Sequence, residues 1–541
     1  MASFYTGAWW VQPHNTMKPN FEEVEGHEQP NKGSTLPAVP HDVIPVPTGE
    51  ISYTDAAKII FPVMGEKRLL FMRGRTPHEI ALGEQEKDIL IPASPERFCN
   101  QIESMGMRVA RRENGTGEMA GKPVWRTTTF PVSSVKVLFR SDAAAEHLPP
   151  IRQLANCPIL TASGEVLAKG YHDHAGGTYI SQGREPDHVP LEVAKNALME
   201  LLVGFAFVTE SDRSRALASL ISPALKMGGH IVDDFPVDVA EANLSQSGKT
   251  YRLKLVPRLY AELPSAVTSA KGGVGSVDEL IAGALIKGRP FIILDNFRGR
   301  LDSTILEEAI RGVGWLTCRA FKSCAEVDTS PFIWQISTNG AEFTRDLANR
   351  AIITRIRKHA DGHVFKTFPT GDLLSHVEAN QTFYLGAIFS VIREWMKNGC
   401  PKTDESRHDF RGWCQVMDWI VQTIFQMPPL LDGHREEQAR TANPALKWLR
   451  DVCHAANASK QLGRDLNTSE LARIADDAGV EFPGNPASQE KPAPRAGKLL
   501  GRLFRESNGK PVSVDGYTVT CREDTNYGNG AEIQKVYTID G

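Results

Sequence analysis

The chain has 541 residues, which is too long for a single hydrophobic core, so two to four domains are expected. Hydrophobic residues make up 41% and charged residues 23% of the chain, the proportions of a soluble globular protein. The net charge of −4 excludes a protein that is basic over its whole surface, so any contacts with nucleic acid should be concentrated in a pore or in one domain.

Two further features of the composition bear on where the protein resides. No apolar run approaches the length that a membrane-spanning helix needs, and the N-terminus lacks a charged start followed by an apolar core. The eight cysteines are scattered singly without a C-x-x-C pair, which argues against a zinc ribbon or a disulfide framework. We therefore expect a cytoplasmic protein with no membrane partner.

The N-terminal third divides into a tail and a small domain. Residues 1–50 are rich in Pro, Asn, Gly and Glu without apolar periodicity, which predicts an unstructured tail. Residues 51–185 carry short mixed signals that predict an α+β accessory domain, with a strand over Lys67–Met72, a helix over Ser94–Met105 and strands over Val132–Arg140. Residues 104–140 hold seven Lys/Arg against two Glu, which fits either a surface that faces nucleic acid or a solvated basic face.

The next segment predicts helices and then a phosphate-binding loop. Residues 190–230 have apolar positions at helical spacing and should pack beside a sheet. They are followed by PVDVAEANLSQSGKT, from Pro236 to Thr250, whose order of β-branched, small and polar, and then amphipathic residues predicts strand, loop and helix. An ordinary strand-to-helix turn is the alternative for this segment taken alone.

A phosphate-binding loop needs particular residues at its end. Ser247 and Gly248 lead into the helix, whose N-terminal N–H groups and dipole would wrap the phosphates of ATP. Lys249 would reach the β/γ oxygens, and the Thr250 hydroxyl would reach Mg²⁺. Asn243 stands where the pattern G-x-x-x-x-G-K-[ST] has its first glycine, which is tolerable because Asn readily adopts a positive φ.

Two later strands complete the expected site. The apolar run Phe291–Leu294 has the length of a buried strand and ends in Asp295, which would hold Mg²⁺ at the carboxyl edge of a parallel sheet. Before it, Ser276 and Glu279 have capping-box spacing and open a helix. The strand over Phe332–Asn339 also ends in a polar tip. Strands that end in GKT, DN and STN, in that order, favour a nucleotide-hydrolysing P-loop core.

In these motifs the sequence resembles the AAA+ ATPases, and more closely the superfamily 3-like helicase module of phage and mobile-element primase-helicase replication proteins. The resemblance implies that Lys249 and Thr250 are Walker A, that Asp295 is Walker B, and that Asn339 is sensor 1, which orients the attacking water. No carboxylate pair of primase type stands out in the N-terminal part. A separate primase, together with a polymerase, would then be a partner.

The segment Thr344–Arg350 resembles the arginine-finger segment of the same family. An arginine finger reaches the γ-phosphate of a neighbouring subunit and stabilises charge in the transition state, so the resemblance implies a ring, with a homohexamer expected. Arg350 is the first choice and Arg345 the second. The alternative is that these arginines form a solvated helix face or ion pairs within one subunit.

The residue after Asp295 departs from the family pattern. Most AAA+ members have Glu there, which polarises the water, whereas this chain has Asn296. An Asn side chain can orient a water but cannot take its proton. Either another carboxylate takes that role, with Glu279 a candidate, or hydrolysis is slow. We still expect turnover, because phosphoryl transfer depends mostly on positioning and charge stabilisation.

The resemblance also implies a hairpin between Walker B and sensor 1 that points into the central channel. Arg319, Phe321 and Lys322 match its basic and aromatic tips in kind. The cations would contact DNA phosphates and the aromatic ring would stack on a base or sugar. An arginine packed at a subunit interface has equal standing as an explanation.

The remainder of the chain predicts a helical region and a DNA-binding tail. Residues 366–442 are expected to be helical, and their aromatic stripe is interpreted as core. Residues 443–541 have the order of a winged helix: a short helix, a loop, a basic helix over Ala496–Ser507 and a hairpin. On the basic helix, Lys498, Arg502 and Arg505 repeat at spacings of four and three and would face DNA. A winged helix that docks on protein is the alternative.

Taken together, the sequence predicts an α/β fold, with an AAA+ P-loop core at 186–365, helical flanks, an N-terminal α+β accessory domain and a C-terminal winged helix. The predicted function is a ring-forming, ATP- and Mg²⁺-dependent helicase that moves along single-stranded DNA and separates duplex. Two alternatives remain. One is an ATP-dependent loader, remodeller or defence ATPase that binds DNA without unwinding it. The other is a DNA-binding scaffold that binds nucleotide without hydrolysing it.

Overall fold

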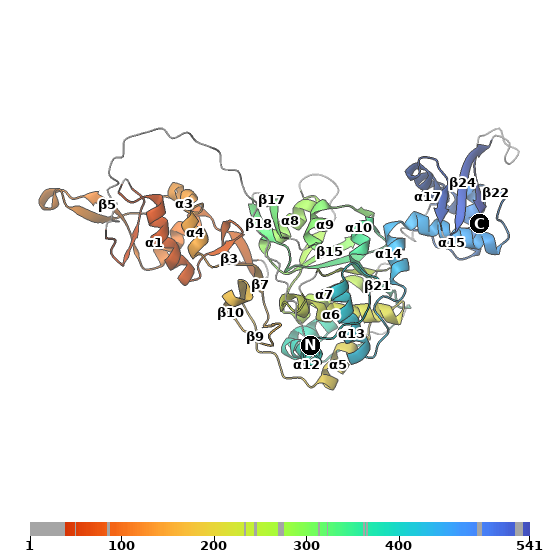
Figure 1. Cartoon of the computed structure of the whole chain (residues 1–541), viewed down its shortest axis with the longest axis horizontal. Coiled ribbons are helices and arrows are strands. Elements are labelled where there is room, and N and C mark those ends of the chain that lie inside the picture. Colours follow the sequence, from red (N-terminus) through yellow and green to blue (C-terminus); the bar gives the residue numbers. More distant parts are fainter. Residues whose placement is uncertain are drawn as a thin grey trace, which may run out of the picture.

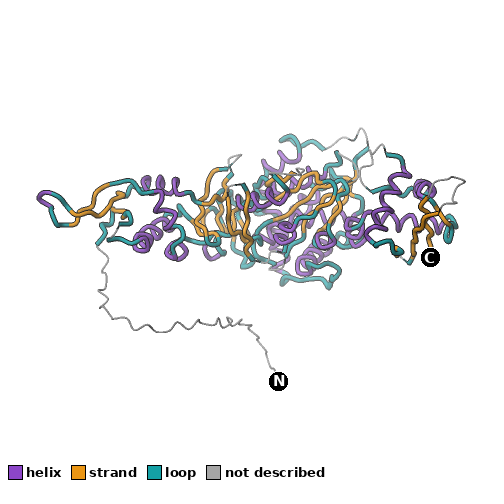
Figure 2. The backbone as a smooth tube through the Cα atoms, turned by 90° about the horizontal axis from the view of Figure 1, so that it is seen from above, coloured by secondary structure: helices purple, strands orange, loops and turns teal. Residues whose placement is uncertain are grey.

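Three bodies follow one another along the long axis of the molecule (Figure 1), and the view from above gives the same order (Figure 2). The computed structural model describes residues 38–541 except 49, 84–86, 232–233, 243–245, 269–274, 312–313, 322, 361–362, 364–365, 484–489, 515 and 525–533. Asn243 and Lys322, two of the predicted site residues, lie outside the described part. Among the helices that are described, none combines the length and the hydrophobicity that crossing a membrane would require.

The N-terminal body is an α+β arrangement with its own core. Its helices pack around Phe61 and Phe98, both buried, and its strands form a sheet of order β1-β5-β6 and a sheet of order β2-β3-β4. The elements are β1 (Val43–Pro45), α1 (Tyr53–Glu66), β2 (Phe71–Arg73), β3 (Thr76–Leu82), β4 (Asp88–Pro92), α2 (Pro95–Ser104), β5 (Arg108–Asn114), β6 (Pro123–Thr127), α3 (Val132–Leu138) and α4 (Asp142–His147).

Two expectations for this region are corrected by the structure. The segment over Val132–Arg140 is a helix and not a pair of strands, because Val135 and Leu138 lie one helical turn apart and bury their side chains in the core of this body. Burial there outweighs the strand preference of its valines. The predicted tail also ends earlier than residue 50, since Val43–Pro45 pairs in parallel with β5.

A small module of short strands connects this body to the next. It holds a sheet of order β10-β11-β7 and the hairpin β8-β9. The module is tied to the central body by Glu262, which accepts a hydrogen bond from the backbone N–H of Asn156 at 3.0 Å. Its strands are β7 (Gln153–Ala155), β8 (Ile159–Leu160), β9 (Val166–Leu167), β10 (Gly170–His172) and β11 (Thr178–Ile180).

The central body is built on a six-stranded sheet of order β12-β21-β13-β19-β15-β14. Every neighbouring pair is parallel except β12 with β21. Because β19 lies between β13 and β15, the polar ends of the three motif-bearing strands meet at one edge of the sheet. The strands are β12 (Ala206–Phe207), β13 (Val237–Glu241), β14 (Ser265–Thr268), β15 (Phe291–Phe297), β19 (Ile333–Thr338) and β21 (Ala351–Arg357).

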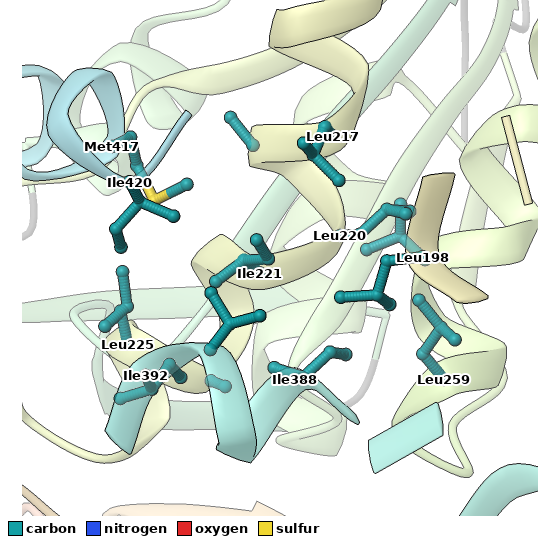
Figure 3. Packing of buried hydrophobic residues seen from close by; sticks show 14 of the residues in the cluster. Leu198, Leu217, Leu220, Ile221, Leu225, Leu259, Ile388, Ile392, Met417 and Ile420 are labelled. Carbon is teal, nitrogen blue, oxygen red and sulfur yellow. The ribbon is translucent and has the colours of Figure 1, made fainter. Parts of the chain in front are cut away.

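Helices cover both faces of this sheet, which explains the continuous apolar run of β15. Phe291 faces the cluster formed by α5, α6, α7, α12 and α13, whereas Ile292 and Leu294 face α8, α9 and the hairpin β17-β18. Figure 3 shows the first cluster, with Leu198, Leu220 and Ile388 among the side chains that meet there. The helices are α5 (Leu191–Glu200), α6 (Glu210–Met227), α7 (Lys249–Leu259), α8 (Val277–Lys287), α9 (Thr304–Ile310), α12 (Gln381–Lys397) and α13 (Arg411–Trp419), and the hairpin strands are β17 (Trp315–Ala320) and β18 (Ser323–Asp328).

Smaller elements surround this core, and the C-terminal body follows. The central body also has β16 (Arg300–Leu301), β20 (Glu342–Phe343), α10 (Arg345–Asn349), α11 (Leu373–Ala379), a π-helical turn (Ile420–Ile424) and α14 (His434–Ala442). The C-terminal body packs three helices on a sheet of order β22-β25-β24-β23. Its elements are α15 (Pro444–Ala458), β22 (Asp465–Leu466), α16 (Thr468–Asp477), α17 (Pro492–Glu506), β23 (Val512–Val514), β24 (Tyr517–Asp524) and β25 (Gln534–Asp540).

The basic helix of the C-terminal body is longer than predicted. It was expected to start at Ala496, but α17 starts at Pro492. A proline is favourable in the first turn of a helix, because its fixed φ suits the helix and its missing N–H would have had no intrahelical partner. The helix, loop, helix and hairpin order predicted for residues 467–541 is the order that the structure has.

Candidate nucleotide site

The segment after β13 makes a sharp turn into α7. Gly248 is the N-cap of α7 and has a φ of 90°, and Gln246 has a φ of 62°. A positive φ is accessible to glycine without steric cost, so Gly248 suits the position at which the chain reverses. Among the described residues, no side chain caps this helix. Its first N–H groups could therefore bind an anion, and the helix dipole favours negative charge there.

Lys249, the first residue of α7, is buried in the site. Only 6% of its surface is exposed. Burial lowers the pKa of the Lys249 ammonium, and the cation of Arg298 lowers it further, whereas the neighbouring Asp295 carboxylate raises it. An anionic ligand would supply the negative charge that this buried ammonium needs. The Oγ of Ser247 is also buried, and no described residue forms a hydrogen bond with it.

Three hydroxyl and carboxyl groups converge at the ends of the strands. The Thr250 hydroxyl donates to Asp295 Oδ1 at 2.7 Å, and the Ser337 hydroxyl donates to the same oxygen at 2.6 Å. The oxygens of Thr250 and Ser337 lie 3.3 Å apart. A carboxylate beside hydroxyl oxygens is the kind of ligand set that Mg²⁺ binds.

Two asparagine side chains extend this cluster toward solvent. Asn296 has a φ of 52°, and its backbone N–H donates to Ser337 Oγ at 2.7 Å. Its side-chain Oδ1 accepts from Asn339 Nδ2 at 3.3 Å, while Asn339 Oδ1 is buried and has no partner among the residues that the structure describes. The left-handed backbone at Asn296 places its amide next to that of Asn339. The pair can hold a water by hydrogen bonding but offers no carboxylate as a base.

Glu279 lies on α8, where both of its carboxylate oxygens accept hydrogen bonds from the backbone. Oε2 accepts from Gly275 N at 2.7 Å, and Oε1 accepts from Phe321 N at 3.0 Å. These N–H donors lower the pKa of the exposed Glu279 carboxyl, that of Gly275 having the larger effect. The Glu279 side chain therefore joins the start of α8 to the tip of the hairpin β17-β18.

The two arginine-finger candidates lie at opposite ends of α10. Arg350 is 14% exposed in its side chain and pairs with Asp346 at 2.6 Å. Arg345 is exposed at the first turn of α10. Of the two, Arg345 has the side chain that is open to a neighbouring molecule.

The predicted DNA-facing residues lie on two separate elements. Arg319 and Phe321 lie in the hairpin β17-β18, and Phe321, at its tip, is 66% exposed. On α17, Arg505 is exposed and Lys498 pairs with Glu490 at 2.6 Å. Arg502 does not point freely into solvent, because it pairs with Glu342 of the central body.

The residues at the sheet edge fit a magnesium-bound nucleoside triphosphate. Three groups could donate to phosphate oxygens: the N–H groups at the start of α7, the buried Lys249 ammonium, and the Ser247 hydroxyl, which has no partner among the described residues. Thr250 and Asp295 lie together and could serve as a metal ligand and as an anchor for metal-bound water. The observations behind this fit are the buried side-chain atoms of Ser247 and Asn339, which have no partner among the described residues, and the contacts of Asp295 with two hydroxyl groups.

Two residues of the site were not assigned a role from the sequence. Ser337 contacts Thr250, Asp295 and Asn296, and the STN tip of the third strand was its only sequence signal. Arg298 follows Asp295 by three residues and is close enough to influence Lys249. It had no pattern of its own that could have marked it.

Comparison with known proteins gives little support for a closer assignment. No family model matches the chain, and no curated protein matches it. Among solved structures, the chain is similar to one titled "SCCmec type IV Cch - active helicase", with 11% sequence identity and a TM-score of 0.32, over 86% of this chain and 90% of that chain. A likeness this low carries no argument about function, which therefore rests on the residues of the site.

Proposed function

We propose that this chain is a ring-forming, ATP-dependent DNA helicase or translocase that serves the replication of a phage, a plasmid or another mobile element. The observation that carries the proposal is the contact of Thr250, Ser337 and Asp295 at the carboxyl edge of a parallel sheet, next to the buried Lys249. In this proposal the central body is an AAA+ P-loop core at 186–365 with a helical region at 366–442. Residues 51–185 form the accessory domain and 443–541 the winged helix.

The residues of the cluster have distinct roles in the proposed reaction, in which ATP and water give ADP and phosphate. Lys249 and the first N–H groups of α7 bind and orient the β- and γ-phosphates. Thr250 and Asp295 would hold Mg²⁺, a cation that would neutralise charge on the phosphate oxygens. Ser337 fixes the Asp295 carboxylate by its 2.6 Å hydrogen bond.

The attacking water is oriented by the amides of Asn296 and Asn339, which lie side by side. Neither can accept the proton, so positioning and charge stabilisation must supply most of the rate. Position 296 is an asparagine and not a carboxylate. This observation favours a DNA-bound loader or remodeller over a helicase. Glu279, the other candidate base, is engaged by two backbone N–H groups.

Assembly into a ring, proposed to be a hexamer, would place an arginine of one subunit at the γ-phosphate of the next. The exposed Arg345 can reach out directly, whereas Arg350 must first leave Asp346. A finger from a neighbouring subunit would link hydrolysis to assembly. A separate primase or polymerase would complete replication.

Contact with single-stranded DNA is proposed for the hairpin β17-β18, and contact with duplex for α17. Phe321 has an exposed ring for stacking, and Arg319 is an exposed cation for phosphate. On α17, Arg505 is the candidate that is open to a phosphate in the present conformation.

A strand-displacement assay tests the proposal. A forked DNA duplex with a fluorophore and quencher at its ends is mixed with the full-length protein, Mg²⁺ and ATP, and Asp295→Asn is the inactive control. ATP-dependent separation that is absent in the variant supports a helicase. ATP hydrolysis without any separation overturns the helicase and favours the loader.

A further inference from the structure

One ion pair connects the basic helix of the C-terminal body to the central body. Arg502 of α17 donates through Nη1 to Glu342 Oε2 at 2.5 Å and through Nη2 to Glu342 Oε1. The two residues are 160 positions apart in the sequence. The contact is a parallel fork of two charge-assisted hydrogen bonds, the geometry in which arginine binds a carboxylate or a phosphate most strongly.

The donors of Arg502 are directed at two carboxylates. Nε donates to Glu506 Oε1 at 2.8 Å, within α17, while both Nη atoms contact Glu342. Glu342 and Glu506 together raise the pKa of Arg502 above its ordinary value, Glu342 having the larger effect. While this arrangement persists, the fork of Arg502 is occupied. A DNA phosphate would need the same two donors.

Glu342 lies in the central body, close in the sequence to residues of the proposed nucleotide site. It begins β20, three residues after Asn339 and three residues before Arg345. Its backbone N–H donates to Gly299 O at 2.9 Å, which ties β20 to the strand β16 beyond Asp295. The side chain of Glu342 is 14% exposed, compared with 36% for Arg502, so the carboxylate belongs to the packed surface of the central body.

The C-terminal body is attached to the rest of the chain through α14 and α15, which lead out of the central body (Figure 1). Its hydrophobic core consists of residues of α15, α16, α17 and its own sheet. The ion pair is therefore a contact between two separately packed bodies, and its loss need not unfold either one.

We propose that Glu342 acts as a phosphate mimic that masks the duplex-DNA surface of α17, and that DNA phosphates displace it. The DNA partner rests on the proposed function, whereas the docking of the two bodies does not. Displacement leaves the Glu342 carboxylate of β20 without its Arg502 partner, and β20 lies between Asn339 and Arg345. Because coupling between two sites is reciprocal, a change at the nucleotide site that moves β20 also exposes or hides α17.

The test measures docking and DNA affinity in the full-length protein. Exposed cysteines are removed by Cys324→Ser and Cys400→Ser, together with Cys521→Ser, and dyes are attached after Asp302→Cys and Lys510→Cys. Energy transfer between the dyes reports whether the C-terminal body is docked. Fluorescence anisotropy of a labelled DNA duplex reports affinity, and the thermal midpoint confirms that each variant is folded.

Glu342→Gln is expected to lower energy transfer and to raise affinity for the duplex about fivefold, because one charge-assisted pair no longer competes with phosphate. Adding duplex to the dye-labelled chain that retains Glu342 should lower energy transfer in the same way. Glu506→Gln is the matched control, since it removes the other carboxylate on Arg502 and leaves the contact between the bodies. The charge exchange Glu342→Arg with Arg502→Glu should restore docking that Glu342→Arg alone abolishes.

Two results would overturn the proposal. Unchanged energy transfer in Glu342→Gln means that the ion pair does not hold the bodies together. Lower energy transfer without any gain in duplex affinity means that α17 is not a masked DNA surface. ATP hydrolysis is measured in the same variants, with Lys249→Ala as the inactive control. Hydrolysis that Lys249→Ala abolishes would show that the nucleotide site is active, whether or not α17 binds DNA.

Discussion

The proposed nucleotide site and the proposed DNA-facing elements of this chain are built in opposite ways. At the carboxyl edge of the sheet, Lys249 is 6% exposed, and Thr250, Ser337 and Asp295 contact one another on or beside rigid strands. At the hairpin tip, Phe321 is 66% exposed, and its backbone N–H donates to the carboxylate of Glu279. On α17, Arg502 is held by carboxylates.

The difference shows how each task constrains the structure. Phosphoryl transfer needs groups fixed to within a fraction of an ångström, which packed strands provide. Contact with a polymer that must move needs exposed groups, whose positions are set by contacts that can break. Substitutions at the sheet edge should therefore lower turnover itself, whereas substitutions at the proposed DNA-facing elements should change how DNA controls turnover.

After Lys249, the largest effect is expected at the proposed arginine finger. Arg345→Ala should lower the turnover number by about a hundredfold or more, because charge on the transferring phosphoryl group loses its stabilising cation. Mixing Arg345→Ala with Lys249→Ala subunits should restore part of the activity, since some interfaces then contain both intact residues. Arg350→Ala is the comparison, and a loss confined to Arg350→Ala would transfer the role to that residue.

A large effect is also expected at Ser337. Ser337→Ala should lower turnover by roughly 10- to 100-fold, because Asp295 loses the hydroxyl that orients it. Thr354→Val on β21 is the matched control, since its buried hydroxyl oxygen has no hydrogen-bond partner in the described part of the chain. Steady-state ATP hydrolysis measures both variants. Equal activities in the two variants would contradict the role of Ser337.

A smaller effect is expected at Glu279, where the comparison between the two regions is sharpest. Glu279→Gln weakens the acceptor that holds Phe321 N and should reduce the stimulation of hydrolysis by single-stranded DNA about threefold. Phe321→Ala should act on the same ratio. If Glu279→Gln instead lowered hydrolysis in the absence of DNA by about a hundredfold, Glu279 would be the general base that accepts the proton of the water, a role that the Asn296 amide cannot fill.

The smallest effect concerns stability and pH. Burial raises the pKa of the Glu262 carboxyl to about 7, with Arg289 and Asn156 opposing the rise. A carboxyl whose pKa is raised by folding stabilises the protein below its ordinary pKa of 4.5, and that contribution is lost as the pH rises through about 7. As the pH rises from about 4.5 to about 7, the free energy of unfolding of the wild type should fall by roughly 1–3 kcal/mol relative to that of Glu262→Gln. Thermal denaturation of both proteins at about pH 5 and pH 7.5 measures the difference, and parallel pH profiles would contradict it.

The parts of the fold that the sequence predicted are those with strong local patterns. The turn at Gly248, the buried strand that carries Asp295 and the helix–hairpin order of the C-terminal body each consist of elements whose patterns are local in the sequence. The helix over Val132–Leu138 was missed because its valines favour a strand, and only its packing in the N-terminal core decides otherwise.

The contacts that the sequence did not predict join distant segments. The pairing of Arg502 with Glu342 spans 160 residues, and that of Glu279 with Phe321 spans 42. The sequence predicted a role in DNA binding for Arg502 and a role in catalysis for Glu279. It could not predict the residues that these two side chains contact. Polar side chains of this kind acquire a role only when the topology brings an acceptor or donor to them.

The most direct test of the account is ATP hydrolysis with and without single-stranded DNA, in the wild type and in Lys249→Ala. We expect measurable hydrolysis that DNA raises several-fold and that Lys249→Ala abolishes, because the buried ammonium is the group proposed to bind the phosphates. Nucleotide binding and oligomerisation without hydrolysis above that of Lys249→Ala would contradict it. The protein would then be a nucleotide-gated scaffold, with Asn296 in place of a catalytic carboxylate.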